Sequence, residues 1–326
     1  MQYRPLGSSD IRVSVFTLGC SGIGGLNWLK GVSHGWPPID EEEVVQGVKA
    51  AVDAGVNHFD TADLYGNGES ERRLGRAFRK LGLRLDDYVI ASKTGYLQGS
   101  AEHPYDPFHI RNQCEQSLRN LGRDYLDLYY LHNAQFGDDD RWLGPAAETL
   151  CDLQKAGKIR LRGQSAYSHA DFEKTIPIVR PDVVQTKVNA MEPEMVEPGS
   201  GLPQLMEKNG ITLTAFAPLA QGRLLGLFRP ENPPQFGNGD VRSNNDGFSK
   251  EQLQQLWRSL NPIIERFGDD PKILAGLFFH AILNYDRVAA FLSGFQAAEM
   301  VQNNLAALEA CQPTSEDLAF VREQFR

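Results

Sequence analysis

The chain has 326 residues, of which 41% are hydrophobic and 23% are charged, a composition typical of a globular protein. Its formal net charge of -9 argues against a nucleic-acid partner, because phosphate backbones are bound by clustered Lys and Arg. The length accommodates either two domains or one α/β barrel of roughly 250 residues with insertions.

The first fifty residues predict a hairpin, a core strand, a long loop and a helix. The Gly-Ser-Ser-Asp turn at residues 7–10 is flanked by short apolar stretches, which is typical of a β-hairpin. Residues 15–18 are expected to form the first core strand, and a glycine-rich loop follows at residues 21–38. Asp40 then resembles a helix N-cap, with Glu43 in the capping-box position.

The rest of the chain alternates between apolar strands and helical patterns. Strands are expected at residues 56–59, 88–91, 126–131, 159–163, 183–184, 211–215 and 288–292. Helices are expected from residue 69 and at residues 107–121, 146–156 and 297–310. This alternation implies parallel pairing, and about eight such units close into a (β/α)8 barrel. We therefore predict an α/β fold: one TIM barrel of residues 1–326 with a short N-terminal β-hairpin and long loops at the C-terminal rim.

A doubly wound open sheet is the alternative to a barrel. It is disfavoured because no G-x-G-x-x-G follows the first strand, and the spacing within Gly22-Ile23-Gly24-Gly25 is wrong for that motif. Two stretches interrupt the alternation, at residues 192–203 and 229–248. The second is too long for an idle connection, so it is either a loop that folds over a ligand or a disordered segment.

Signals for export, membranes and metals are missing from the pattern. The N-terminus has no charged stretch followed by an apolar one, and the apolar run at residues 273–283 is too short to span a bilayer. The four cysteines are scattered, without metal-ligand spacing. We expect a cytoplasmic chain with free thiols, no membrane partner and no metal site.

Four chemically active residues fall at or just beyond three consecutive strand ends. They are Asp60, Tyr65, Lys93 and His132. Each has an ordinary structural explanation when taken singly: a turn cap, a packed ring, a strand-end ion pair and a buried core histidine. Because the carboxyl ends of parallel strands meet at one rim, we expect the four side chains to converge there.

Together the four residues suit proton donation to a carbonyl group. A tyrosine with a reference pKa of about 10 is a weak acid at neutral pH. We expect the Lys93 cation to lower the pKa of Tyr65 by favouring its phenolate, and Asp60 to keep Lys93 charged and oriented. His132 would orient the substrate oxygen or pass a proton.

At these residues the sequence resembles the aldo-keto reductase superfamily, over nearly its whole length. The segments that carry the resemblance are DAGVNHFDTADLYGNGESERRLGRAF, VIASKTG, YLDLYYLH, AGKIRLRGQSA, VVQTKVNAM, TAFAPLAQGRL and SGFQAAEMVQNNLAAL. The resemblance implies a (β/α)8 barrel that binds NADP(H) or NAD(H) at its C-terminal rim. It also implies that Tyr65 is the general acid/base and that hydride passes between nicotinamide and a carbonyl or alcohol carbon.

The resemblance also assigns the cofactor contacts. They are Ser165, Gln185, Phe216, Leu219, Gln221, Gly222, Gly294, Gln296, Met300 and Asn304. At the nicotinamide end, Ala166 replaces the asparagine that usually follows the serine, and Phe216 replaces the usual stacking tyrosine. At the other end, Gly294, Gln296 and Met300 occupy positions where the family often has Lys or Arg for the 2′-phosphate of NADP. NADH is therefore a serious alternative to NADPH, with Arg223 as a candidate compensating charge.

The substrate pocket is expected to draw on the loop after the first strand and on two later strand ends. Trp28, Tyr96 and Asn133 are its predicted members. Mixed aromatic and polar side chains suit a sugar, a polyol or a small aromatic carbonyl compound. The sequence is also similar to the branch that oxidises sugars with NAD, of the L-galactose dehydrogenase type. The oligomeric state is not readable.

Two other functions stay open at this point. A nicotinamide-binding regulatory subunit, of the potassium-channel β type, would keep the same four residues with only incidental turnover. A barrel hydrolase would pair Asp60 with Asp63 or Asp127. Asp127 should lie inside a strand among apolar neighbours, which makes a paired-acid site improbable.

Overall fold

The computed structural model describes the backbone of residues 1–326 and every side chain except that of Leu85. Eight parallel strands form a closed barrel in chain order, as predicted. They are β3 (Phe16–Gly19), β6 (His58–Asp60), β7 (Val89–Thr94), β8 (Leu126–Leu131), β9 (Ile159–Ser165), β10 (Val183–Lys187), β11 (Thr212–Phe216) and β12 (Val288–Gly294). The barrel closes where Phe291 of β12 pairs with Phe16 of β3.

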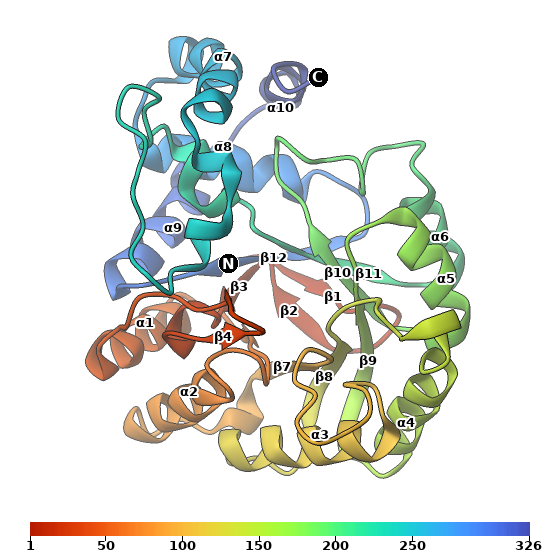
Figure 1. Cartoon of the computed structure of the whole chain (residues 1–326). Helices are drawn as coiled ribbons and strands as arrows, with labels where there is room; N and C mark the ends of the chain where they lie inside the picture. The colour runs from red at the N-terminus through yellow and green to blue at the C-terminus, as the bar shows by residue number, and fades with distance from the viewer.

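Helices surround this barrel, and Figure 1 shows them as a ring around the strands. They are α1 (Glu41–Asp53), α2 (Glu69–Lys80), α3 (Pro107–Leu121), α4 (Leu143–Lys155), α5 (His169–Val179), α6 (Gly201–Asn209), α7 (Lys250–Phe267), α8 (Pro271–Leu283), α9 (Ala298–Ala310) and α10 (Ser315–Glu323). Each barrel helix turns an apolar stripe inward, such as Val44, Val48 and Ala51 of α1. The main core therefore lies between the strands and the helices.

The predicted N-terminal hairpin is present and closes one end of the barrel. It consists of β1 (Tyr3–Pro5) and β2 (Arg12–Ser14), and it lies behind the ring of strands in Figure 1. Leu6 and Val13 pack against side chains from the beginnings of the barrel strands, such as Val183. With that end plugged by apolar side chains, the opposite rim is the one left to hold a ligand.

The loop expected at residues 21–38 contains a short hairpin that the sequence pattern did not reveal. Its strands are β4 (Trp28–Leu29) and β5 (Val32–Ser33). The long segment at residues 229–248 is held against this hairpin: Val241 N donates to Gly35 O at 2.8 Å, and Asn244 Nδ2 donates to Ser33 O at 2.9 Å. Two short 3-10 helices, Val241–Asn244 and Asp246–Phe248, give this segment a defined conformation.

The expected capping box at the start of α1 is wrong. Asp40 is the N-cap residue, but its side chain makes no capping hydrogen bond. The carboxylate of Glu43 turns instead to α9, where its Oε2 accepts from Ala298 N at 2.7 Å. A tertiary partner far along the chain has replaced the local one.

Several expected boundaries also shift by a few residues. The strands β9 and β12 run on to Ser165 and Gly294, and α4 begins at Leu143 rather than at residue 146. Within the part of the chain that the structure describes, every helix falls short of the length and apolar character needed to cross a lipid bilayer.

Candidate active site

The four candidate catalytic residues meet at the C-terminal rim of the barrel. Asp60 ends β6, Lys93 lies in β7, His132 follows β8, and Tyr65 lies in the turn after β6. Parallel register places Asp60 opposite Ala91, two residues before Lys93, so the two side chains approach each other across neighbouring strands. The four side chains therefore converge at one rim, and their catalytic roles stay a prediction.

Lys93 is the centre of the group. Its ammonium donates to an Asp60 carboxylate oxygen, to Thr61 O at 2.9 Å and to Tyr65 Oη at 3.3 Å. These three acceptors match the three donors of an ammonium group. The Lys93 and Asp60 side chains are only 0% and 2% exposed, so the ion pair lies in a medium where charges interact more strongly than in water.

The second oxygen of Asp60 is held by an amide from the opposite side of the barrel. Gln185 Nε2 donates to Asp60 Oδ2 at 3.0 Å and to Thr214 Oγ1 at 3.2 Å. Thr214 Oγ1 in turn shares a hydrogen bond of 3.0 Å with Tyr130 Oη. Both amide hydrogens of Gln185 are thus used inside the barrel, which orients the carboxylate toward Lys93.

The expectation that Lys93 lowers the pKa of Tyr65 is wrong for this structure. Burial raises the pKa of the Tyr65 phenol well above its ordinary value, and the negative charge of Asp60 raises it further. The phenol therefore keeps its proton at neutral pH, with its oxygen 3.3 Å from the Lys93 ammonium. Such a group is a hydrogen-bond donor toward the cavity rather than a preformed phenolate.

His132 is buried beside the phenol and is neutral. Its ring meets the Tyr65 ring edge-on, with centroids 5.7 Å apart, and meets Tyr96 in the same way at 4.8 Å. Burial lowers the pKa of His132 well below its ordinary value, and the Lys93 cation lowers it further. A neutral imidazole orients an oxygen by a hydrogen bond without changing charge near neutral pH.

A cavity of about 1060 Å³ opens in front of these residues. Asp60, Tyr65 and His132 line it, while Lys93 lies behind them and is fully buried. All ten of the predicted cofactor contacts line the same cavity: Ser165, Gln185, Phe216, Leu219, Gln221, Gly222, Gly294, Gln296, Met300 and Asn304. This volume is at the upper end for small-molecule sites, which is what a dinucleotide and a substrate together require.

The segment after β11 wraps along this cavity in a strained conformation. Ala217, Ala220 and Gln221 have positive φ values of 55°, 49° and 59°, and Gly222 follows at 88°. Such left-handed residues turn backbone amides toward one side and persist only where the surroundings enforce them. Asn245 holds the side chain of Gln221, because its Nδ2 donates to Gln221 Oε1 at 2.7 Å. An amide-rich segment along the middle of the cavity fits a pyrophosphate.

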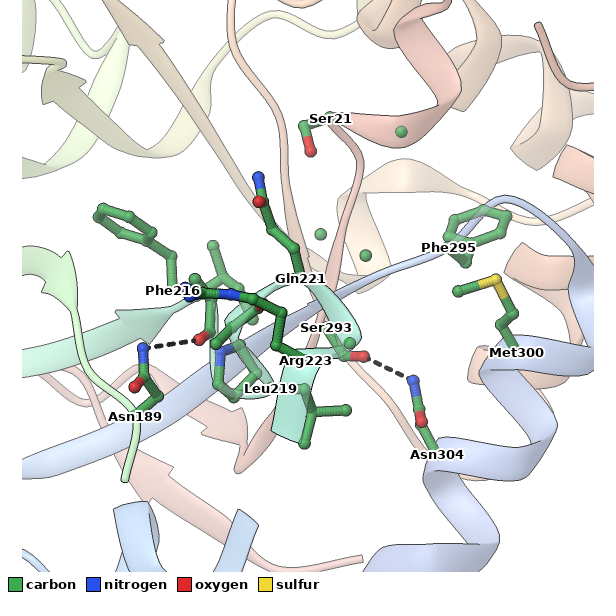
Figure 2. A pocket seen from close by; sticks show the side chains of 18 of the residues that line it. Ser21, Asn189, Phe216, Leu219, Gln221, Arg223, Ser293, Phe295, Met300 and Asn304 are labelled. Atoms are coloured by element: carbon green, nitrogen blue, oxygen red, sulfur yellow. Dashed lines mark hydrogen bonds between the residues drawn. The ribbon is translucent and has the colours of Figure 1, made fainter. Parts of the chain in front are cut away.

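The cavity is long, and its two ends differ. Figure 2 shows Phe216 toward one end, Met300 and Asn304 toward the other, and Gln221 between them. Asn304 Nδ2 donates to Ser293 Oγ at 2.9 Å. The lining therefore fits an elongated dinucleotide, with an aromatic face at the reactive end and amide side chains at the far end.

The comparison with known families decides the identity. A family model described as the Aldo/keto reductase family matches residues 24–324. The chain belongs to this family. It is an NAD(P)-dependent oxidoreductase acting on carbonyl or CH–OH groups, and its cofactor is NADP(H) or NAD(H).

Individual relatives are distant but similar over their whole length. This aldo/keto reductase is 27% identical to L-glyceraldehyde 3-phosphate reductase of Escherichia coli (strain K12), covering 98% of this chain and 91% of that one. It is also 27% identical to L-galactose dehydrogenase of Arabidopsis thaliana, covering 94% and 88%. The structure of aldo-keto reductase AKR11C1 from Bacillus halodurans, a holo form, shares its fold with a TM-score of 0.77 at 24% identity, covering 100% and 97%.

The three residues predicted for the substrate pocket lie outside the lining of this cavity. Asn133 is buried in a structural role: its Nδ2 donates to Gly95 O at 2.8 Å, and its Oδ1 accepts from Gln135 N at 2.9 Å. Tyr96 lies behind His132, and Trp28 is half-exposed on the β4–β5 hairpin. Their role toward the substrate stays a prediction, because a position at a strand end does not by itself place a side chain in the cavity wall.

Other residues of this reductase line the cavity without having been predicted to do so. Trp36 and Tyr167 contribute aromatic rings, and Asn189 contributes an amide that donates to Ala217 O at 3.3 Å. Trp36 was within the loop expected to form the rim, and Tyr167 lies two residues beyond Ser165. An aromatic residue just after a strand end was the available signal for Tyr167.

The two acids considered as partners of Asp60 in a hydrolase, Asp63 and Asp127, lie outside the lining of the cavity. Asp127 lies in β8 as expected, but its carboxylate is not among apolar neighbours: it pairs with Arg123 at 2.8 Å and with Arg160 at 3.0 Å. Asp63 is buried beside α3, where its Oδ2 accepts from Gln113 at 3.0 Å. Burial raises the pKa of Asp63 to about 7.

Proposed function

We propose that Tyr65 donates a proton to the carbonyl oxygen of the substrate during reduction and takes one from the hydroxyl during oxidation. The observation that carries this proposal is the phenol oxygen lying 3.3 Å from the Lys93 ammonium, in the wall of the large cavity. The raised pKa of Tyr65 keeps the proton in place until a developing alkoxide takes it.

Lys93 stabilises the state that follows proton transfer, and Asp60 holds Lys93 in place. When Tyr65 loses its proton, a phenolate is formed beside a fixed ammonium in a buried site. Lys93 is already oriented by Asp60 and Thr61, so no side chain has to reorganise as the charge develops. Bulk water then returns the proton to Tyr65.

His132 orients the substrate oxygen. Its ring lies beside the Tyr65 ring, and its lowered pKa leaves it neutral, so it donates a hydrogen bond without adding a charge that would compete with Lys93. Two donors converging on one oxygen favour a carbonyl group in a single orientation.

The nicotinamide cofactor, when bound, supplies or accepts the hydride at the carbon. Ser165 and Gln185 would hold its carboxamide, and Phe216 would offer the aromatic face on which its ring stacks. Gln185 has both amide hydrogens committed to Asp60 and Thr214, so only its oxygen remains to accept a hydrogen bond from a ligand.

The substrate is a small carbonyl or alcohol compound, and we propose a hydroxylated one such as a sugar or polyol. Aromatic rings of Trp36 and Tyr167 and the amide of Asn189 line the cavity, a mixture that suits the apolar faces and hydroxyl edges of such molecules. The names of both curated relatives point to small hydroxylated compounds, and their equal identity favours neither.

We further propose that the chain acts as one domain in the cytoplasm. The eight barrel strands follow each other in chain order around a single barrel, which supports one folding unit. All four cysteines are free, and Cys20 and Cys114 are buried, as is usual in a reducing compartment.

The test follows the absorbance of reduced nicotinamide while a panel of aldehydes, ketones, sugars and polyols is offered with NADH and with NADPH. We expect turnover with at least one hydroxylated aldehyde or sugar. Tight nicotinamide binding without turnover on any member of the panel would contradict the proposal and would favour a regulatory subunit that only senses the cofactor.

A further inference from the structure

The first turn of α9 carries a contact that the proposed chemistry does not use. Glu43, from α1, accepts a hydrogen bond from Ala298 N at 2.7 Å. Ala298 is the first residue of α9, and its N-cap residue Ala297 has no side chain able to accept from the free amides. A carboxylate from another helix therefore occupies the position where an anion would otherwise be attracted.

This turn borders the far end of the cavity. Gln296 and Met300 line the cavity on either side of Ala298 in the sequence, and Asn304 lines it one helical turn further on. Gln296 Nε2 is turned away to Gly22 O at 2.7 Å. The far end thus offers amide and thioether groups, with the carboxylates of Glu43 and, in the first turn of α9, Glu299 beside them.

Positive charges line other parts of the cavity. Within the part of the chain that the structure describes, the cationic lining residues are Lys187, Arg223, Arg242 and Lys272. Lys187 is paired with Glu192 at 2.5 Å, and Arg242 is paired with Asp240 at 2.6 Å. Arg223 Nε donates to Ala220 O at 3.1 Å, within the strained segment, and Lys272 lies in the first turn of α8. These two are the lining cations that could still bind a phosphate.

The reactive end fixes which part of a dinucleotide reaches α9. The nicotinamide must lie by Tyr65 and Phe216, where a hydride meets the substrate carbon. The pyrophosphate would then lie along the strained segment at Gln221, and the adenosine would extend toward Met300 and Asn304 of α9, which Figure 2 shows on the other side of Gln221 from Phe216. In NADPH, this adenosine carries an additional phosphate on its ribose; in NADH it carries a hydroxyl.

We propose that Glu43 is a specificity-determining residue that makes this cavity select NADH over NADPH. The proposal rests on the proposed function. A 2′-phosphate at the first turn of α9 would meet the carboxylate of Glu43, find the Ala298 amide already taken and find no cation on α9. A 2′-hydroxyl meets no such repulsion. The amide nitrogens of Gln296 and Asn304 already donate to Gly22 O and Ser293 Oγ, so their side-chain oxygens are left to accept a hydrogen bond from it.

The charge of Glu43 acts through solvent, so its effect is moderate. Glu43 is exposed, and repulsion between exposed charges is weakened by water and by salt. We expect the wild-type protein to bind NADH about tenfold more tightly than NADPH at low ionic strength, and the preference to shrink as salt screens the repulsion.

The test measures dissociation constants of the full-length protein for NADH and NADPH by titration calorimetry. The same titrations with adenosine 2′,5′-bisphosphate and AMP isolate the adenosine end. In Glu43→Gln an acceptor oxygen remains for Ala298 N, so the helix cap is kept while the charge is removed. We expect NADPH to bind about three- to tenfold more tightly to this variant, with NADH changed by less than about twofold.

Three further variants test whether the effect is specific to the charge of Glu43. Glu42→Gln removes a neighbouring carboxylate of α1 that pairs with Lys80 of α2. This variant should leave the ratio of the NADH and NADPH affinities unchanged. Gln296→Arg in the Glu43→Gln background should add at least about another tenfold for NADPH, because an arginine can bind a phosphate with two hydrogen bonds. Lys272→Met removes a cation from the cavity wall, and it should change the affinities for NADH and NADPH by the same factor.

Four results would overturn the inference while leaving the enzyme assignment intact. The first is that the wild type binds NADPH as tightly as NADH or more tightly. The second is that Glu43→Gln changes the affinities for both cofactors equally, and the third is that Glu42→Gln changes the ratio of the two affinities as much as Glu43→Gln does. The fourth is that Lys272→Met loses affinity for NADPH alone. If neither cofactor bound to the folded wild-type protein, the proposed function itself would fail along with the inference.

Discussion

The two ends of the cavity differ in how far their charged groups are exposed to water. At the reactive end, Lys93 and Asp60 are buried, and each donor of the ammonium has an acceptor. At the far end, Met300 is 42% exposed, and the carboxylates of Glu43 and Glu299 are exposed to solvent. Charges interact strongly where water is excluded and weakly where it is not. The chemistry is therefore expected to tolerate few changes, whereas cofactor choice should be adjustable by single surface substitutions.

The largest expected effect breaks the buried ion pair. Lys93→Met leaves the Asp60 carboxylate buried without its cation, and we expect a loss of about 3–5 kcal/mol in the free energy of unfolding. Urea unfolding measures this loss. Adding Asp60→Asn removes the unpaired charge, so the double variant should recover a large part of the stability. A double variant as unstable as the sum of the two single variants would contradict the ion-pair interpretation.

A second, smaller effect concerns the buried acid next to the reactive end. Burial raises the pKa of Asp63 to about 7, above the value in an unfolded chain. The unfolded state therefore releases this proton first, and Asp63 destabilises the fold increasingly as pH rises from about 4 to about 7. Below about pH 4 Asp63 is protonated in both states and its ionisation does not affect stability. Above about pH 7 it is ionised in both states, and the loss of stability no longer changes with pH.

Asp63→Asn should remove this pH-dependent cost. Between about pH 5 and about pH 8, its stability relative to the wild type should rise by about 2–3 kcal/mol, because two pKa units correspond to roughly that energy. Urea unfolding at the two pH values measures it. A stability difference that is the same at both values would show that Asp63 does not titrate in this range.

The smallest expected effect lies at the far end. Asn304→Ala removes the hydrogen bond to Ser293 Oγ and an amide from the cavity wall. Losing one hydrogen bond from that amide to the dinucleotide costs about 1 kcal/mol, so the KM for the dinucleotide should rise about fivefold with kcat unchanged. Steady-state kinetics with varied cofactor concentration would measure KM and kcat separately. A fall in kcat with an unchanged KM would mean that the two ends are coupled more tightly than their separation implies.

The reactive end was readable from sequence because its members follow apolar strands. Asp60, Lys93 and His132 each stand at a strand end, and strand periodicity with residue type was enough to group them. The closed barrel and the N-terminal hairpin were predicted for the same reason, since local apolar patterns define both.

What could not be predicted depends on partners distant in the chain. The capping box at Glu43 fits the local pattern, but the carboxylate is used by Ala298, 255 residues away. The direction of the Tyr65 pKa shift depends on how deeply the ring is buried, which no spacing rule gives. The β4–β5 hairpin has strands of two residues, too short for a period to appear, and it carries Trp28 away from the cavity.

The measurement that most directly tests the role of the reactive end is single-turnover reduction by Tyr65→Phe. With enzyme and reduced cofactor premixed, the rate constant for oxidation of the nicotinamide by a substrate aldehyde is read in a stopped-flow instrument. Loss of the proton donor should slow this step about 10²- to 10⁴-fold, while the dissociation constant of the cofactor stays within about twofold of the wild type. A rate constant within about threefold of the wild type would contradict the assignment of Tyr65 as the acid.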